Sequence, residues 1–367
     1  MTKARRFFIA LFAVLTLAAT AGTALAQAPG TRRAQGQEVP DAQGEKMMEG
    51  MPKPASQIDP REEMRNFIRA ISIYTRQFNR DFIVVAEGGL ELLDATNPLE
   101  GGGPIVATSY VRAIDGVLVD GLYYAPVALR KKEDVDKTDE KVTEDLLKRA
   151  NFAKGHGLDV LVIDYPDKRA GAQASYSKNL KNGFVPFAAI DVGSKFNAIP
   201  SFPYRPFREN PNNITGLDSI RNFAQVLDSR DYAKQEEFVM AMHRSNFDAL
   251  IVDVFHRDRE PFTKDSIQGL KFKQLGARRL VLATMDIGHA DDYRYYWKDG
   301  WHEGSPHWIA APVPGMADSY YVNYWEPGWQ EIISGNPNSY AYGIVAQGYD
   351  GVVLKGVDAF KFFEVGQ

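Results

Sequence analysis

Eight short apolar segments recur along the chain after residue 80, and this repetition constrains the fold more than any other feature. Most of them are apolar at every position, which is typical of parallel strands covered on both faces. We expect strands at residues 82–86, 116–123, 159–164, 184–190, 249–255, 280–287, 320–324 and 351–354.

Helical patterns lie between many of these segments. We expect helices at residues 64–78, 141–154, 219–227, 235–245, 263–275 and 339–347. The alternation predicts a single-domain α/β fold, a (β/α)8 TIM barrel over residues 61–367. An open doubly wound sheet is the alternative. No glycine-rich phosphate fingerprint follows the first strand, and we interpret Gly101 to Gly103 as a turn.

The N-terminal residues predict export. Lys3, Arg5 and Arg6 precede the apolar run 7–17, and Ala24-Leu-Ala26 is a small-residue cleavage site. Residues 1–26 therefore resemble a signal peptide cut after Ala26, which places the protein in the periplasm or outside the cell. An uncleaved membrane anchor is the alternative, although the apolar run is short for a bilayer span. Residues 27–60 have no aromatic residue, and we expect a disordered linker there.

Charge and cysteine content exclude several classes of function. The first 26 residues hold three of the 43 basic residues, so the remaining chain has 40 basic and 47 acidic residues and a net charge of −7. This balance argues against nucleic acid, or a membrane after signal cleavage, as a partner. The chain has no cysteine, which excludes disulfides, thiol nucleophiles and zinc–thiolate sites.

Carboxylates follow most of the predicted strands. In a barrel, the chemistry takes place where the parallel strands end. Paired acids at this rim suit glycoside hydrolysis, because one can protonate the leaving group while the other acts as base or nucleophile. The strand-end acids are Glu87, Asp120, Asp164, Asp191, Asp253, Asp286 and Asp358.

A metal site is a second use for such acids. Asp253 and His256, and then Asp286 and His289, repeat an Asp-x-x-His pattern after two successive strands. Carboxylates with histidines can hold a catalytic metal. A metal-dependent hydrolase that uses these four residues is therefore an alternative, but the main interpretation needs neither a metal nor a cofactor.

All five tryptophans lie between Trp297 and Trp329, among many tyrosines. We expect about half of these rings to pack in the core and the others to lie near the rim. Aromatic faces suit the CH faces of sugar rings, so the block favours a carbohydrate ligand. A protein-binding patch is the competing interpretation.

Several segments together resemble a known family. In the second half these are Asp286-Ile-Gly-His-Ala-Asp-Asp-Tyr-Arg-Tyr-Tyr-Trp297, Tyr324-Trp-Glu-Pro-Gly-Trp-Gln330 and Gly348-Tyr-Asp-Gly-Val-Val-Leu-Lys-Gly-Val-Asp-Ala359. In the first half they are Phe82-Ile-Val-Val-Ala-Glu-Gly-Gly89, Ile114-Asp-Gly-Val-Leu-Val-Asp-Gly-Leu-Tyr-Tyr124 and Val160-Leu-Val-Ile-Asp-Tyr165. They resemble glycoside hydrolase family 114 and its extracellular relatives, over residues 62–363. The resemblance implies a (β/α)8 barrel that acts as an endo-α-1,4-polygalactosaminidase.

The chain departs from the family in two ways. The two halves come in the reverse order, which implies a circular permutation with new termini between the strand 352–354 and the helix from Met64. A closed barrel tolerates this change because its first and last strands are neighbours. Key acids also differ, because Lys355 replaces an Asp, His289 replaces a Glu and Asp120 replaces a Glu. Asp164, Asp253 and Asp358 match acidic positions of the family.

These patterns and the resemblance predict an exported glycoside hydrolase that acts on an amino-sugar, galactosamine-type polysaccharide. We expect Asp120 to be a general acid or nucleophile, Asp286 or Asp253 to be its partner, and His289 to act as acid or base. Lys355 would neutralise the rim or bind an anionic sugar. A polysaccharide-binding barrel that has lost catalysis is the alternative. The remaining residues expected to bind substrate are Glu87, Asp164, Tyr165, Tyr293, Trp297, Tyr324, Trp325, Lys355 and Asp358.

Overall fold

The computed structural model describes residues 58–95, 105–130, 136–193 and 195–365. The predicted signal peptide, the turn at Gly101 to Gly103 and residues 27–57 of the predicted linker lie outside these residues. The last linker residues, Asp59 and Pro60, are described and belong to the start of the first helix.

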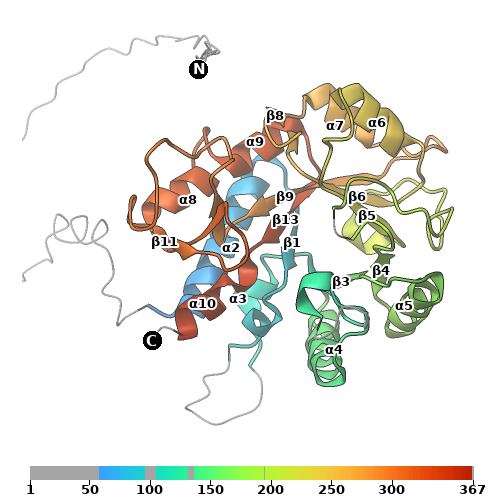
Figure 1. Cartoon of the computed structure of the whole chain (residues 1–367), viewed down its shortest axis with the longest axis horizontal. Coiled ribbons are helices and arrows are strands. Elements are labelled where there is room, and N and C mark those ends of the chain that lie inside the picture. The colour runs from blue at the N-terminus through green and yellow to red at the C-terminus, as the bar shows by residue number, and fades with distance from the viewer. Residues whose placement is uncertain (1–57, 96–104, 131–135, 194, 366–367) are drawn as a thin grey trace, which may run out of the picture. The chain divides into compact units, whose positions relative to one another are not determined.

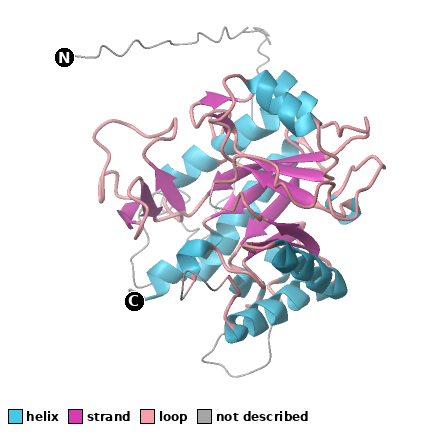
Figure 2. Ribbon diagram, turned by 45° about the vertical axis from the view of Figure 1, so that its right-hand side comes forward, coloured by secondary structure: helices cyan, strands magenta, loops and turns pink. Residues whose placement is uncertain are grey.

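Eight parallel strands form one sheet in the order β4-β3-β2-β1-β13-β9-β6-β5. The helices lie around this sheet, which occupies the middle of the described residues (Figures 1 and 2). The strands are β1 (Ile83–Glu87), β2 (Gly116–Asp120), β3 (Asp159–Asp164), β4 (Val185–Ala188), β5 (Phe223–Val226), β6 (Ala249–Val252), β9 (Leu280–Asp286) and β13 (Gly351–Lys355).

The two ends of this sheet lie close to each other. The ring of Phe187 on β4 is 5.6 Å from the ring of Phe223 on β5. No backbone ladder joins β4 to β5 in the described residues, so the sheet is nearly closed into a barrel. The strands follow one another around it in chain order, without the reversal of a doubly wound sheet. The predicted α/β barrel is thus confirmed in its strand count and strand direction.

One predicted strand and one predicted helix were wrong. Residues 219–227 were expected to be a helix, but they contain β5, which completes the sheet. Residues 320–324 were expected to be a barrel strand, but β12 (Ser319–Val322) pairs antiparallel with β10 (His289–Asp291) and β11 (Ile309–Pro312) in a separate sheet. Both segments are four-residue strands, and so short a pattern does not specify which neighbours it pairs with.

Four of the described helices, α2, α4, α7 and α9, begin after a residue whose side chain caps the first turn. The side chain of Asp59 accepts hydrogen bonds from the backbone of Arg61 and Glu62, and Pro60 occupies the first turn of α2. The helices are α2 (Pro60–Phe78), α3 (Thr108–Val111), α4 (Glu140–Gly155), α5 (Arg169–Asn182), α6 (Gln235–His243), α7 (Lys264–Leu270), α8 (Pro327–Ile333), α9 (Tyr340–Gln347) and α10 (Phe360–Val365). Short 3-10 turns are η2 (Leu90–Leu93), η3 (Val127–Leu129), η4 (Leu217–Ser219) and η5 (Val357–Ala359), and a small hairpin pairs β7 (Phe255–His256) with β8 (Glu260–Pro261).

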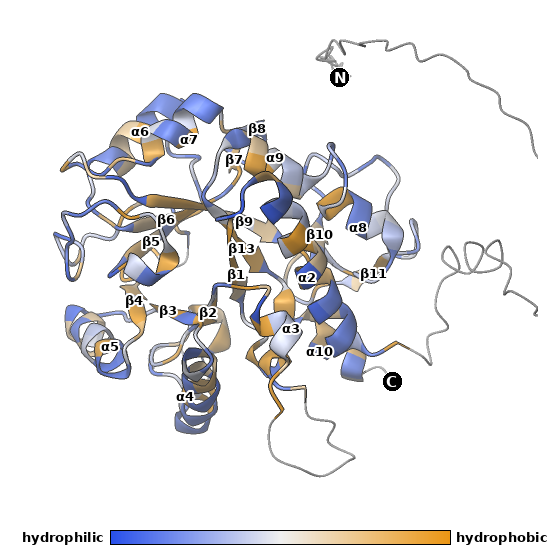
Figure 3. Ribbon diagram, turned by 180° about the vertical axis from the view of Figure 1, so that it is seen from behind, coloured by the Kyte–Doolittle hydropathy of each residue, from blue (hydrophilic) through white to orange (hydrophobic). Residues whose placement is uncertain are grey.

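The core lies between the barrel strands and the inner faces of the helices. Met64, Phe67, Ile68 and Ile71 follow the spacing of one helix face, and all four are buried. Figure 3 shows the strands as the most apolar part of the fold and the helices as largely hydrophilic. No helix in the described part of the chain combines the length and apolar character that a bilayer crossing needs.

The first and last described helices, α2 and α10, contact each other. Arg61 near the start of α2 forms an ion pair with Glu364 in α10. The hydroxyl of Tyr324 donates to the carbonyl of Pro60 over 2.7 Å. Helix α2 therefore closes the ring of elements between β13 and β1.

Candidate active site

Strand register places four charged residues on the inner face of the barrel. Glu87 of β1 pairs with Leu118, and Asp120 lies two residues further along β2, so both side chains point to the same side. Lys355 of β13 pairs with Asp286 of β9 at the same level. Asp120 pairs with Ile163, and the next residue, Asp164, points outward to α5. The rim of the barrel therefore brings together Glu87, Asp120, Lys355 and Asp286.

Lys355 and Glu87 form an ion pair at the centre of this group. Lys355 Nζ donates to Glu87 Oε1 over 2.8 Å. Glu87 Oε2 is buried and has no partner among the described residues. Burial alone would lower the pKa of Lys355, but the charge and hydrogen bond of Glu87, with Asp120 and Asp286, raise it above the usual value. Lys355 is thus a fixed cation among three carboxylates.

Asp120 has a carboxyl group suited to proton transfer. Solvent reaches the residue at the open rim, but its partly buried carboxyl group accepts a 2.5 Å hydrogen bond from the hydroxyl of Tyr165. The surrounding protein atoms desolvate the carboxylate, and this with the charge of Glu87 raises the pKa of Asp120 to about 6. The Tyr165 hydrogen bond and Lys355 act in the opposite direction. Asp120 therefore keeps a substantial protonated fraction near pH 6.

Asp286 and His289 form a second unit on the same rim. Asp286 Oδ1 accepts the backbone N–H groups of Gly288 (3.0 Å) and His289 (2.8 Å), and Oδ2 lies 3.1 Å from His289 Nδ1. Burial acts to raise the pKa of Asp286, but His289 and Lys355 together lower it below its ordinary value. Burial acts to lower the pKa of His289, but Asp286, Asp358 and Asp291 raise it. Asp286 thus stays ionised and orients the imidazole.

Two glycines permit this close arrangement. A Cβ on Gly356, whose φ is +69°, would lie 2.3 Å from Asp286 Oδ1 and 2.9 Å from His289 Nδ1. A Cβ on Gly288 would lie 2.1 Å from the carbonyl oxygen of Gly356. The turn after β13 therefore packs directly on the Asp286–His289 unit, and only glycine fits at either position.

Two predicted site acids have structural partners instead. Asp164 is fully buried, and its carboxylate accepts from the backbone of Tyr123 and Tyr124 and from Ser175 and Asn179. It holds α5 and the loop after β2 against β3, so the structure does not bring it to the rim as a substrate ligand.

Asp253 is likewise engaged. Arg294 donates to its two oxygens over 3.0 and 2.8 Å, and both side chains are about nine-tenths buried. This bidentate pair joins the end of β6 to the segment after β10. We therefore no longer expect Asp253 to be the partner of Asp120.

The aromatic block divides between core and surface. Tyr324 and Trp329 are both fully buried, and because of this burial Tyr324 is not placed to bind substrate. Trp329 Nε1 donates to the carbonyl of Ile287. Trp297 stacks on Tyr320, and Trp325 packs edge-on against Tyr324 and Phe363. Tyr293 is half exposed, and its hydroxyl donates to Asp291.

The four residues of the metal alternative do not assemble. Within the described residues, no group of three or more histidine, aspartate or glutamate side chains could hold a metal ion. Asp253 binds Arg294, and the buried ring of His256 packs against Phe262. The metal-dependent hydrolase is therefore not supported by the arrangement of these side chains.

Sequence reasoning missed three contributors to the site. Arg294 anchors Asp253, and Gly288 and Gly356 make room for Asp286 and His289. Asp358 was expected at the rim, and the structure places it on η5 beside Gly88 and close enough to His289 to raise the pKa of that ring. The sequence did offer a way to find the two glycines, because Gly288 follows Asp286 by two residues and Gly356 directly follows Lys355 at the strand ends.

Asp191, the acid that follows the fourth strand, is engaged within its own loop. Asp191 follows β4 with a φ of +61° and accepts hydrogen bonds from Ser201. Its carboxylate is used within its own loop.

The similar proteins have no described activity. No protein-family model matches the chain. An uncharacterized protein of Methanocaldococcus jannaschii is 31% identical over 156 residues, which are 42% of this chain and 42% of the relative. Uncharacterized proteins of Deinococcus radiodurans (31% over 121 residues, 33% of this chain and 36% of the relative) and Thermotoga maritima (29% over 145 residues, 40% and 43%) are also similar. The chain thus matches less than half the length of each relative.

Proposed function

We propose that this protein is an exported glycoside hydrolase that cleaves a galactosamine-type amino-sugar polysaccharide at the rim of its barrel. The main support for the proposal is that the pKa values of two carboxyl groups on the rim, Asp120 and Asp286, are shifted in opposite directions. The pKa of Asp120 is raised to about 6, mainly by desolvation, whereas that of Asp286 is lowered below its ordinary value despite burial. Environments that separate the pKa values of two carboxyl groups in this way indicate which group is the protonated acid and which is the ionised carboxylate.

Asp120 is the general acid of the proposed reaction. Its protonated form would donate to the oxygen of the leaving sugar, and the hydrogen bond from Tyr165 fixes the position of the carboxyl group. Asp286 remains ionised and stabilises positive charge that develops on the sugar ring. A water molecule then adds to the anomeric carbon of the sugar, and its proton returns to the Asp120 carboxylate, which has given up its own proton. His289, held through Nδ1, can relay this proton through Nε2, which makes no hydrogen bond with a described residue.

The charge of the rim supports the proposed substrate. Glu87, Asp120, Asp286 and Asp358 outnumber Lys355 and His289 there. An acidic rim attracts a cationic, de-acetylated polymer of amino sugars. The half-exposed ring of Tyr293 and the partly buried ring of Trp297 lie in the segment that follows His289, and we propose that they contact sugar CH faces.

A polysaccharide-binding barrel without catalysis is the second candidate. The Lys355–Glu87 ion pair favours it, because Lys355 neutralises an acid where a glycosidase needs a free carboxylate. Under this alternative the rim would retain the polymer without cleaving it.

An assay of reducing-end release on de-acetylated galactosamine polymer tests the proposal. We expect release by the wild type and a loss of about 100- to 10,000-fold in Asp120→Asn, the usual contribution of a general acid. Asp145→Asn is the matched control, because Asp145 is exposed on α4 and, among the described residues, its one ion pair is with the partly exposed Arg149. Retention of the polymer without release supports the binding protein, and absence of both contradicts the proposed substrate.

Two further proposals concern the whole chain. We propose that the barrel is a circular permutation of the family 114 arrangement, which the ion pair between Arg61 and Glu364 makes feasible by keeping the ends close. We also propose export, which rests on residues 1–26 alone. Sequencing the N-terminus of the protein recovered from its native host tests the predicted cut after Ala26.

A further inference from the structure

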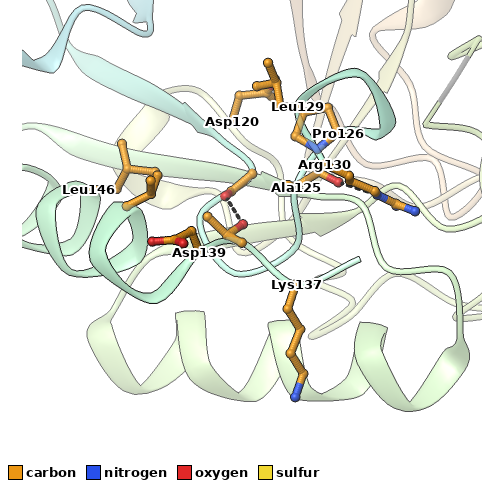
Figure 4. A pocket seen from close by; sticks show the side chains of 11 residues that line it. Asp120, Ala125, Pro126, Leu129, Arg130, Lys137, Asp139 and Leu146 are labelled. Atoms are coloured by element: carbon orange, nitrogen blue, oxygen red, sulfur yellow. Dashed lines mark hydrogen bonds between the residues drawn. The ribbon is translucent and has the colours of Figure 1, made fainter. Parts of the chain in front are cut away.

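A cavity of about 560 Å³ adjoins the candidate general acid. It lies between the loop after β2 and helix α4, and Asp120 and Gly121 are among the residues that line it. Such a volume is typical of a small-ligand site. Figure 4 shows its labelled side chains, with Leu129 beside Asp120 and Leu146 reaching in from α4. The cavity is thus continuous with the rim where the proposed chemistry takes place.

The polar groups of this cavity are already engaged. Arg130 donates to the carbonyls of Ala125 and Tyr165 and forms a bidentate pair with Asp167. Thr138 donates to the carbonyl of Gly121, and Asp139 caps α4 by accepting from the backbone of Lys141. Lys137 points away from the other labelled side chains (Figure 4). These groups have little hydrogen-bonding capacity left for a ligand.

The remaining walls are aliphatic. Ala125, Pro126, Leu129, Val142 and Leu146 line the cavity, and Leu129 and Val142 are strongly exposed. Val142 and Leu146 lie on one face of α4 because they are four residues apart. The described lining residues include no aromatic ring, so the cavity lacks the flat surface that sugar rings favour. Exposed aliphatic side chains beside a catalytic carboxyl group are typical of a ligand-binding surface.

We propose that this cavity binds an aliphatic acyl substituent on the sugar adjacent to the scissile bond. The proposal rests on the proposed function, since it identifies the sugar next to Asp120 as acylated while neighbouring sugars remain cationic. The acyl chain packs on Leu129, Val142 and Leu146, and the sugar to which it is attached lies at Asp120. The protein would accordingly select partly acylated polymer.

Binding of a series of acylated ligands tests this inference without requiring catalysis. The probes are galactosamine trimers that are unacylated or carry an N-acetyl, N-propionyl or N-butyryl group, and the dissociation constant for the full chain is measured by calorimetry. We expect affinity to increase about fourfold with each added CH₂, which corresponds to about 0.8 kcal/mol per buried CH₂.

Two matched variants locate the effect. Val142→Asp places a charge in the apolar wall and should abolish the dependence on chain length. Val127→Asp is the control, because Val127 is an exposed valine in the loop after β2 that does not line the cavity, so this variant should keep the fourfold steps. Both positions are exposed, so neither change should unfold the protein, which circular dichroism verifies.

The outcomes separate the two proposals. Equal affinity for all four trimers, or the same steps in Val142→Asp as in the wild type, would overturn the acyl site. Fourfold steps without any polymer cleavage would support the acyl site and reject the hydrolase. Cleavage without the steps would do the reverse, and failure to bind any trimer would reject both.

Discussion

Replacement of Arg294 by Met should destabilise the fold strongly, because it leaves a buried carboxylate without a partner. Arg294 donates to both oxygens of Asp253 over 3.0 and 2.8 Å, and the two side chains are 13% and 10% exposed. Removing one partner of a buried pair costs about 3–5 kcal/mol. For a domain of about 300 residues, an unfolding entropy of about 2.1 cal/mol/K per residue converts this cost into a fall in melting temperature of roughly 5–8 °C.

The assay is urea unfolding followed by circular dichroism, with the free energy of unfolding compared between variants. Arg149→Met is the control, since Arg149 pairs with Asp145 across one turn of α4 at the surface, and it should cost only about 0.3–0.5 kcal/mol. The double variant Arg294→Met, Asp253→Asn should lose less stability than Arg294→Met alone, because the unpaired charge is gone. A cost no greater than that of Arg149→Met would refute the assignment of Asp253 to a structural role.

Three other predictions concern the rim. Tyr165→Phe removes a hydrogen bond that lowers the pKa of Asp120, so the limb of kcat/KM on which Asp120 loses its proton should move above pH 6, and no upward shift would contradict this role. Gly356→Ala should displace Asp286 and His289 and lower kcat about 100-fold with the fold retained; unchanged kcat would show that the turn is not constrained. The pKa of Asp120 is raised from 3.8 to about 6 in the folded protein, so ionisation of this group makes the fold less stable as the pH rises through that window. Urea titrations should therefore show that Asp120→Asn gains stability relative to the wild type between pH 4 and pH 7.

The barrel could be predicted because seven of its strands are continuously apolar. Residues 351–354 and 82–86, for example, contain almost only aliphatic side chains and pair as β13 and β1. Strand β5 was missed because Gln225 interrupts a run of only four residues, and the flanking pattern also fits a helix. Gln225 is nevertheless buried, so tertiary packing overrides the local pattern.

The candidate site could be predicted only to the level of the rim. Strand-end position identified Glu87, Asp120 and Asp286, the family resemblance identified Lys355, and register brings the four together. It could not show which acids are engaged elsewhere, since that depends on partners distant in the sequence. Arg294 lies 41 residues from Asp253, and Asn179 lies 15 residues from Asp164 on the buried face of α5.

The aromatic block shows the same limit. Clustering in the sequence indicated rings near the rim, but whether a ring is buried depends on the elements that cover it. Trp329 and Tyr324 are buried by contacts with the end of β9 and the start of α2, whereas Tyr293 is half exposed.

The central claim is that Asp120 protonates the leaving group, and a comparison of two substrates tests it most directly. A 4-nitrophenyl galactosaminide trimer releases a phenolate that needs no proton, whereas cleavage within the polymer requires one. We predict that Asp120→Asn lowers kcat/KM for the polymer by about 100-fold or more but changes hydrolysis of the nitrophenyl trimer only several-fold. Equal loss on both substrates, or no loss on the polymer, would contradict the account.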